Sequence, residues 1–160
     1  MLVCKGTPRA ICVVTIAHDG LAGARDAVRY VAGLPLPAHT RLRLVGVAEP
    51  VRYSSTAPGI LRATLRAAVA RVEDERRRIL EAALRPEAAE LRARVSSVDV
   101  RVTVGLPTPE ILRNADATET DLLVVGARGL GTMKRLLLGS VSETVLRHAS
   151  CPVLIVRRRA

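Results

Sequence analysis

The chain has 160 residues, 49% of them hydrophobic, and a formal net charge of +10. A chain of this length can bury one sizeable core but is too short for two ordinary domains, so we expect a single domain over residues 1–160. No stretch approaches the roughly 18 uncharged apolar residues that a membrane-spanning helix needs, and the N-terminal segment lacks the apolar run of a secretory signal. We therefore expect a cytoplasmic protein without a membrane partner.

The positive charge suggests a nucleic-acid partner, because basic surfaces release counterions from a phosphate backbone. The arginines that carry this charge are scattered along the chain, however, and only Tyr30 and Tyr53 could offer aromatic rings for stacking on bases. We therefore expect no specific nucleic-acid binding, whereas nonspecific binding to polyanions remains open. The cysteines, Cys4, Cys12 and Cys151, have no paired spacing and predict neither a disulfide framework nor a metal site.

Strands and helices are predicted to alternate from the start of the chain. Ile11–Ala17 is an apolar strand, the Asp19-Gly20 turn follows it, and an amphipathic helix runs through Ala24–Val31. Arg41–Ala48 is predicted as the second strand. Pro50–Gly59 is long, polar and aperiodic, which is typical of a mobile flap, and the sequence leaves open whether this loop closes over a ligand.

The middle of the chain predicts one long helix, two strands and a shorter helix. The long helix carries apolar residues from Leu61 onward, and Pro86 should end or kink it because proline lacks a backbone N–H. Val98–Val104 alternates strictly between apolar and polar residues, so one face of this third strand, or its edge, must meet water. Thr108 is the predicted N-cap of the next helix. Leu122–Val125 is apolar on both faces and is therefore predicted as a central fourth strand.

The last predicted elements are a helix over Ser140–His148 and a strand over Val153–Val156. At the edge of a sheet this wholly apolar strand would leave an unpaired hydrophobic edge, which natural proteins cover. The simplest cover is the same strand of a second molecule, so we expect a homodimer through Val153–Val156. The recurring order of strand and helix predicts an α/β fold with a parallel sheet.

A glycine-rich segment joins the fourth strand to the last helix and contains Gly126, Gly129, Gly139 and Ser140. It lies at the carboxyl edge of the predicted sheet, where ligands collect in open parallel sheets. Ser140 and Glu143 fit a capping box, which places the start of the helix at Ser140. The free N–H groups of this helix start and its partial positive charge favour a phosphate as the ligand.

The pattern of strand, G-x-x-G, nine residues, G-S and helix resembles the nucleotide-binding motif of the universal stress protein family, G-x-x-G-x9-G-[S/T]. The Asp19-Gly20 turn, the Gly105–Pro107 segment and the closing Ala149–Val156 segment extend the resemblance over nearly the whole chain. The resemblance implies a Rossmann-like fold, in which helices cover both faces of a five-stranded parallel sheet with the strand order 3-2-1-4-5. It also implies dimerisation through the last strand.

The nucleotide-binding branch of that family implies ATP or another adenine nucleotide as the ligand, with magnesium as a candidate companion. Base and ribose would lie against the ends of the first two strands, and the phosphates would lie on the glycine turn. The residues that would contact the nucleotide are Ala17, Asp19, Val47, Val125, Gly126, Arg128, Gly129, Gly139, Ser140 and Ser142. Arg128 and Lys134 could neutralise phosphate charge. His18 stands where the family often has an apolar residue. It could approach the ligand, but we favour the interpretation of a partly exposed structural histidine.

The sequence favours binding over turnover. It contains no P-loop and no G-x-S-x-G elbow, and its three histidines belong to no catalytic motif. Phosphoryl transfer needs a positioned nucleophile, and the sequence shows only groups that could hold phosphate. The leading hypothesis is a nucleotide-dependent regulatory module in the stress response. The alternatives are slow ATP hydrolysis or autophosphorylation, with Ser140, Ser142 or Thr132 as acceptors, and a ligand-free interaction protein on the same fold.

Overall fold

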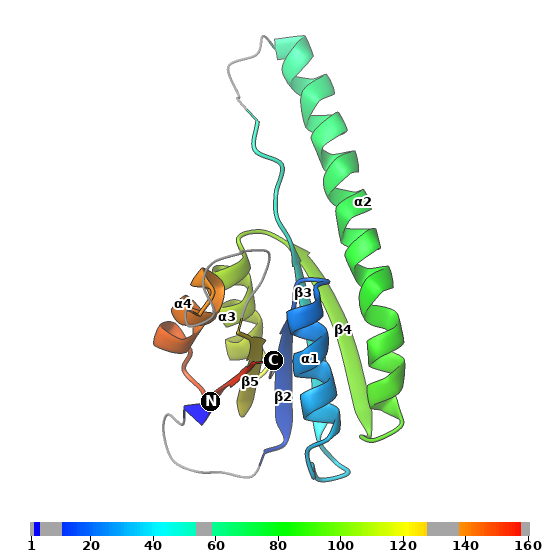
Figure 1. Ribbon diagram of the computed structural model, residues 1–160. Coiled ribbons are helices and arrows are strands. Elements are labelled where there is room, and N and C mark those ends of the chain that lie inside the picture. Colours follow the sequence, from blue (N-terminus) through cyan, green and yellow to red (C-terminus); the bar gives the residue numbers. More distant parts are fainter. Residues whose placement is uncertain (1, 4–10, 54–58, 128–137, 158–160) are drawn as a thin grey trace.

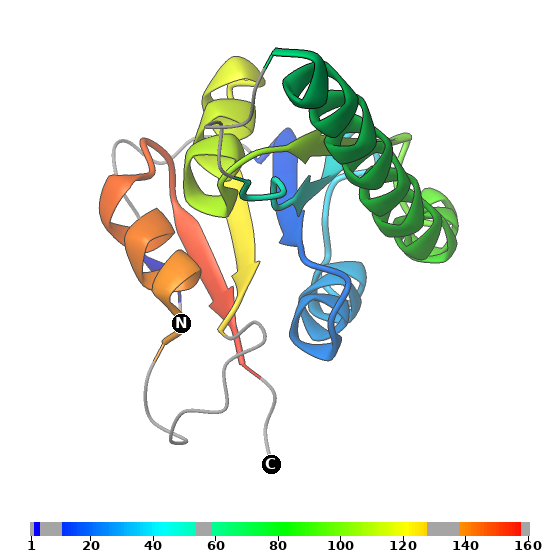
Figure 2. The same cartoon turned by 90° about the horizontal axis from the view of Figure 1, so that it is seen from above.

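The computed structural model describes residues 2–3, 11–53, 59–127 and 138–157. They form one six-stranded sheet with helices on both faces (Figures 1 and 2). The strands are β1 (Leu2–Val3), β2 (Val13–His18), β3 (Arg41–Ala48), β4 (Ser97–Val104), β5 (Leu122–Gly126) and β6 (Val153–Val156). The helices are α1 (Ala22–Ala32), α2 (Gly59–Arg92), α3 (Pro107–Ala117) and α4 (Ser140–His148).

The strands β2 to β6 are parallel, as predicted. β2 pairs with both β3 and β5, and β4 and β6 extend the sheet on either side in the same direction. Counted along the chain from β2, the strand order is 3-2-1-4-5, which confirms the predicted fold class. Parallel neighbours need crossover connections, and the four helices supply them in turn.

The edge of the sheet beside β6 differs from the prediction. β1 pairs antiparallel with β6, with Leu2 opposite Leu154 and Val3 opposite Val153. The chain itself therefore covers part of the apolar edge from which we inferred a dimer. A strand of two residues shows no periodicity, so no pattern in the sequence could predict β1. The homodimer stays a prediction.

Apolar side chains form a core on each face of the sheet. On one face, Val31 of α1 and Leu84 of α2 belong to the same buried cluster as Ile16 of β2. On the other face, Ile111 of α3 and Val145 of α4 form a second cluster with residues of β5 and β6. Strands that are buried on both faces must be apolar on both, which is why β5 and β6 read as continuous hydrophobic runs.

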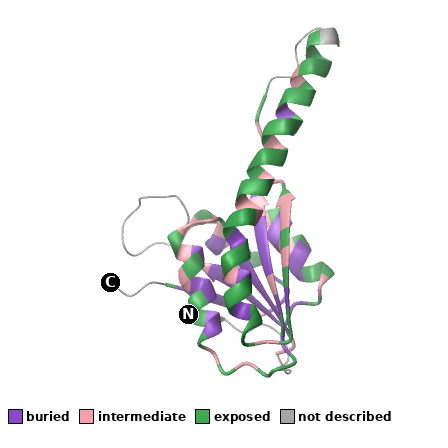
Figure 3. Ribbon diagram, turned by 90° about the vertical axis from the view of Figure 1, so that its right-hand side faces the viewer, coloured by how far each residue is buried: buried purple, intermediate pink, exposed green. Residues whose placement is uncertain are grey.

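Helix α2 is continuous through Pro86, so of the two predicted outcomes, an end of the helix or a kink, the end is wrong. Leu84, Ala88 and Leu91 are fully buried against the sheet and hold this part of α2 in place. Pro86 itself lies on the exposed side, where water can solvate the carbonyl that loses its N–H partner. The first part of α2 projects beyond the sheet (Figure 3), and Leu61 there is 58% exposed.

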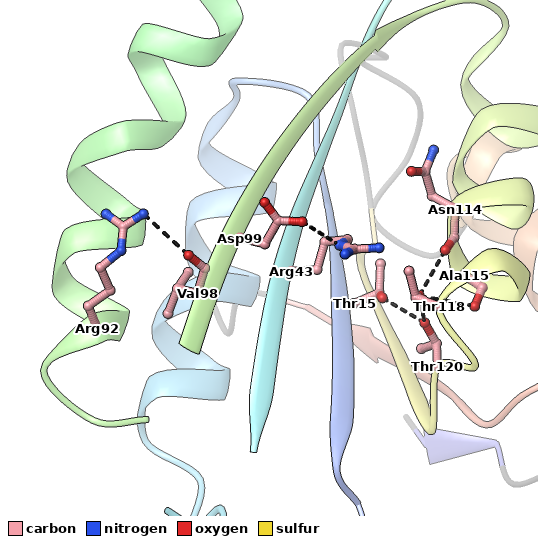
Figure 4. A network of polar contacts seen from close by, with 9 residues as sticks. All are labelled: Thr15, Arg43, Arg92, Val98, Asp99, Asn114, Ala115, Thr118 and Thr120. Carbon is pink, nitrogen blue, oxygen red and sulfur yellow. Dashed lines mark hydrogen bonds and ion pairs between the residues drawn. The ribbon is translucent and has the colours of Figure 1, made fainter. Parts of the chain in front are cut away.

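Polar side chains link neighbouring elements below the carboxyl edge of the sheet (Figure 4). The hydroxyl of Thr15 in β2 lies 2.7 Å from that of Thr120, which precedes β5, and Thr118 lies 2.9 Å from Thr120. Arg43 of β3 donates to Asp99 of the edge strand β4 at 2.8 Å. These bonds help to fix the strands whose carboxyl ends form the site described next.

Candidate functional site

A cleft opens at the carboxyl ends of β2, β3 and β5 and has a volume of about 520 Å³. The chain passes from β2 to β3 on one side and from β5 to β6 on the other, so the cleft lies where the strand order reverses. Open parallel sheets bind ligands at this position, and clefts of this size hold small organic molecules. The lining residues are Ala17, His18, Asp19, Ala24, Val45, Val47, Glu49, Pro107, Ile111, Val125, Gly126, Gly139, Ser140, Val141 and Ser142.

One wall of the cleft is formed by the ends of β2 and β3. Ala17 and Val47 give this wall an apolar surface, and Asp19 and Glu49 add two carboxylates. Asp19 Oδ1 accepts a hydrogen bond from the backbone N–H of Leu21 at 2.9 Å, which fixes the side chain at the start of α1. The wall therefore combines an apolar contact surface with negatively charged hydrogen-bond acceptors.

The turn after β2 depends on a glycine and on His18. Gly20 has a φ of +83°, a backbone conformation that glycine adopts without strain. Its N–H donates to His18 Nδ1 at 3.0 Å, while His18 Nε2 lies 2.5 Å from Glu87 Oε2 on α2. His18 is only 4% exposed, so the prediction of a partly exposed histidine is wrong. Burial lowers the pKa of His18 below its usual value, although the Glu87 carboxylate opposes this shift.

The opposite wall is the start of α4, where the predicted capping box is wrong. Gly139, rather than Ser140, is the N-cap, and no side chain among the described residues caps the first turn. Glu143 instead pairs with Arg147 at 2.7 Å, because this partner lies one turn further along the same helix. The predicted start of the helix at Ser140 is nevertheless confirmed. The first turn of α4 thus keeps backbone N–H groups that a ligand could use.

Helix α3 also starts differently from the prediction. It begins at Pro107, with Leu106 as its N-cap, and Thr108 makes no capping hydrogen bond. Proline is favoured in the first helical turn because its fixed φ suits the helix and its missing N–H is not needed there. Pro107 consequently lies in the lining of the cleft.

Gly126 joins the two walls at the end of β5. A Cβ atom at this position would lie 2.9 Å from the backbone oxygen of Gly23, so only glycine lets β5 and α1 approach this closely. The carbonyl oxygen of Gly126 accepts a hydrogen bond of 2.7 Å from the hydroxyl of Ser142. Ser142 is buried, and this bond ties the first turn of α4 to β5.

The structure brings eight of the ten predicted contact residues together around one cleft. These are Ala17, Asp19, Val47, Val125, Gly126, Gly139, Ser140 and Ser142. Arg128 and Gly129 lie outside the described residues, as do Lys134 and Thr132. The sequence interpretation missed Glu49, although it directly follows a predicted strand, and that position alone marks it as a candidate for the carboxyl edge of the sheet.

Two classes of site find no support in the described part of the chain. None of its helices is long and apolar enough to cross a membrane. Among the same residues, no three His, Cys, Asp or Glu side chains gather in a way that could hold a metal ion.

The sheet topology defines an α/β protein of the Rossmann-like class, with a cleft at the strand reversal. Residues 13–157 match the family model of the universal stress proteins, and the chain belongs to this family. A universal stress protein of Thermus aquaticus is 37% identical over 147 residues, which cover 90% of this chain and 97% of that relative.

Solved structures of the family have the same fold. The universal stress protein UspA from Lactobacillus plantarum superimposes with a TM-score of 0.79 at 20% identity, over 94% of this chain and all of that one. A universal stress protein described as a complex with cAMP superimposes with a TM-score of 0.61 at 26% identity. That alignment covers 93% of this chain and 98% of the other.

Proposed function

We propose that this protein binds ATP, or another adenine nucleotide, in the cleft and acts as a nucleotide-dependent regulatory module in the stress response. The observation that carries the proposal is the contrast between the walls of one cleft. An apolar surface with two carboxylates faces a helix start that no described side chain caps. The cAMP complex of the family member at 26% identity supports an adenine nucleotide as the ligand class.

This contrast sets the direction in which a nucleotide would lie. Asp19 and Glu49 would repel phosphates from the wall of β2 and β3, whereas the partial positive charge of α4 would attract them. The base would then pack on Ala17 and Val47. The Asp19 oxygen that is not bonded to Leu21 would accept a hydrogen bond from a ribose hydroxyl.

Binding without turnover is the form of the proposal that the site supports. Ser142 already donates its hydroxyl proton to the Gly126 carbonyl, which makes this side chain a poor acceptor for a phosphoryl group. Ser140 is exposed at the start of α4 and would contact the phosphates as a hydrogen-bond donor. Magnesium would accompany the phosphates as their counterion rather than as a ligand of a protein cluster.

The test compares ATP binding in the wild type with Ser140→Asp and Ser140→Asn. The aspartate adds a negative charge where phosphates are proposed to lie, so we expect calorimetry to show at least a roughly tenfold loss of affinity. The asparagine has nearly the same shape without the charge and should stay within about threefold of the wild type. Both variants should fold, because a polar or acidic side chain in the first turn of a helix is tolerated or favourable.

Mass spectrometry of nucleotide released from freshly purified protein completes this test. Released adenine nucleotide, together with a selective loss of affinity in Ser140→Asp, supports the proposal. A wild-type protein that neither carries nor binds an adenine nucleotide contradicts it and leaves a ligand-free interaction protein as the function. Consumption of ATP, or a phosphorylated protein after incubation with ATP and magnesium, would identify an enzyme instead.

A further inference from the structure

His18 connects the ligand-facing turn to helix α2 through both nitrogens of its ring. Nδ1 accepts the N–H of Gly20 at 3.0 Å, and Nε2 lies 2.5 Å from Glu87 Oε2. A ring nitrogen that accepts a hydrogen bond carries no proton, so the proton of the neutral ring resides on Nε2, which faces the Glu87 carboxylate. These two partners together select one neutral tautomer of the imidazole.

Glu87 provides a fixed anchor for this tautomer. It lies in the part of α2 that packs on the sheet, beside the fully buried residues Leu84, Ala88 and Leu91. Arg25 of α1 approaches the second carboxylate oxygen of Glu87 at 3.6 Å and therefore faces the same cluster. The connection thus runs from the turn after β2 to a part of α2 that the core holds in place.

We propose that His18 is a positioning residue that holds the Asp19-Gly20 turn in its ligand-binding conformation by linking the Gly20 N–H to Glu87. This inference rests on the proposed function, because Asp19 is the residue of the turn that would contact the nucleotide. The turn needs such support because Gly20 has a positive φ and glycine has the most backbone freedom to lose. The other described bonds of the turn, from Leu21 to Asp19 and from Arg25 to the Gly20 carbonyl, are exposed to water.

Protonation of His18 would break this connection. The imidazolium carries protons on both nitrogens, so Nδ1 could no longer accept the Gly20 N–H. The charged groups around the ring are Glu87 of α2 and Asp19 of the turn, which favour protonation, and Arg25 of α1, which opposes it. Burial is the largest influence and lowers the pKa of His18 below its usual value, so the ring is neutral at neutral pH.

The direction of the pH effect follows from this lowered pKa. The unfolded chain binds a proton at His18 at a higher pH than the folded chain, so the contribution of the neutral ring is fully present above the ordinary histidine pKa. It is lost as the pH falls through the lowered pKa of the folded protein. Nucleotide affinity should therefore decline as the pH falls, and the Asp19-Gly20 turn should become less ordered.

The experiment measures ATP affinity in the wild type, His18→Asn and His18→Leu at about pH 7.5, where the ring is neutral, and at a pH below the apparent pKa that an NMR titration gives for the His18 ring. Asparagine can accept the Gly20 N–H through its side-chain oxygen but does not titrate, whereas leucine cannot accept it. At the higher pH we expect His18→Leu to bind roughly tenfold more weakly and His18→Asn to stay within about threefold of the wild type. The exposed histidine variant His39→Asn is the matched control and should behave as the wild type.

The ratio of the wild-type dissociation constant to that of His18→Asn isolates the effect of His18 protonation on ATP affinity, because the titration of the ATP phosphates cancels in the ratio. The proposal predicts that this ratio rises severalfold on acidification. NMR of the ligand-free protein gives a second readout, in which the Gly20 amide should shift with the same apparent pKa as the His18 ring. A ratio that stays constant with pH, or a Gly20 amide that ignores ring protonation, overturns the proposal.

This design separates the inference from the proposed function. If no form of the protein binds an adenine nucleotide, the proposed function fails. The amide titration still decides whether His18 positions the turn, since that readout needs no ligand. If nucleotide binds but His18→Leu and His18→Asn lose affinity equally, the acceptor role of Nδ1 is wrong.

Discussion

The two walls of the cleft use their polar groups differently. On the wall of β2 and β3, His18 and Asp19 are already bonded to the backbone of their own turn, and His18 is also paired with Glu87. On the wall of α4, no described side chain caps the first helical turn, and Ser140 is exposed. The turn after β2 in the first wall is fixed by bonds within the protein, whereas the second wall keeps hydrogen-bond donors for a ligand.

One wall of the cleft therefore sets its shape, and the other wall recognises the charge of a ligand. A wall whose polar groups are paired within the protein has a fixed shape, because moving it would leave buried groups without partners. An uncapped helix start offers N–H groups and a partial positive charge that a ligand can use without displacing a protein side chain. Substitutions that loosen the first wall should therefore reduce stability, whereas a substitution of the exposed Ser140 on the second wall should act mainly on the ligand.

The largest effect is expected for Gly126→Ala, at the point where both walls meet β5. The added Cβ would lie 2.9 Å from the Gly23 backbone oxygen, and a backbone atom in a packed helix cannot easily move away. We expect a loss of about 2 kcal/mol in the free energy of unfolding, measured by urea denaturation. Gly59→Ala is the control, since a Cβ at Gly59 meets nothing within 4 Å, and it should be neutral or slightly stabilising. Equal stability of the two variants would show that β5 and α1 can separate freely.

A smaller effect is expected for Ser142→Ala, which tests how α4 is attached to β5. The change removes the partly buried 2.7 Å bond from the Ser142 hydroxyl to the Gly126 carbonyl, so thermal or urea unfolding should show a loss of about 1 kcal/mol. Thr144→Ala removes a similar hydroxyl bond to the Ser140 carbonyl that is exposed to water, and it should cost less than about 0.5 kcal/mol. If the two losses are the same, the partly buried bond is not what holds α4.

The smallest effect is expected for Asp19, whose bond to Leu21 is exposed. Asp19→Ala removes the acceptor of the Leu21 N–H and should cost about 0.5 kcal/mol of unfolding free energy. Asp19→Asn keeps an acceptor at the same position and should be close to the wild type in stability. A marked destabilisation by Asp19→Asn would mean that the charge of this carboxylate, rather than its hydrogen bond, fixes the turn.

Elements with strong local signals were predicted residue for residue. Arg41–Ala48, Ser140–His148 and Val153–Val156 occupy the predicted positions as β3, α4 and β6. Their apolar runs are bounded by turn residues, so the pattern fixes both ends. A local rule also competes with packing, as at Pro86, where the predicted end of the helix does not occur because the buried side chains of α2 keep the helix intact.

The carboxyl edge of the sheet could be predicted as the position of the site, because a parallel α/β order places the ends of successive strands together. The glycine spacing similarly indicated Gly126, Gly139 and Ser140, all of which line the cleft. Glu49 and the buried state of His18 were not predicted. The position of Glu49 directly after a predicted strand could have indicated it. The burial of His18, in contrast, depends on which distant segments pack against it, and a sequence pattern contains no direct information on such contacts.

The sequence by itself determined the order of strands and helices, the parallel sheet and the edge at which a ligand site forms, because hydrophobic periodicity and connection rules act locally. The tertiary structure alone decided that β1 covers part of the β6 edge and that His18 meets Glu87 across the fold. It also decided that Gly139, and not Ser140, is the N-cap of α4. These features arise from contacts between residues far apart in the chain or from the balance between competing hydrogen-bond partners, which only the packed fold settles.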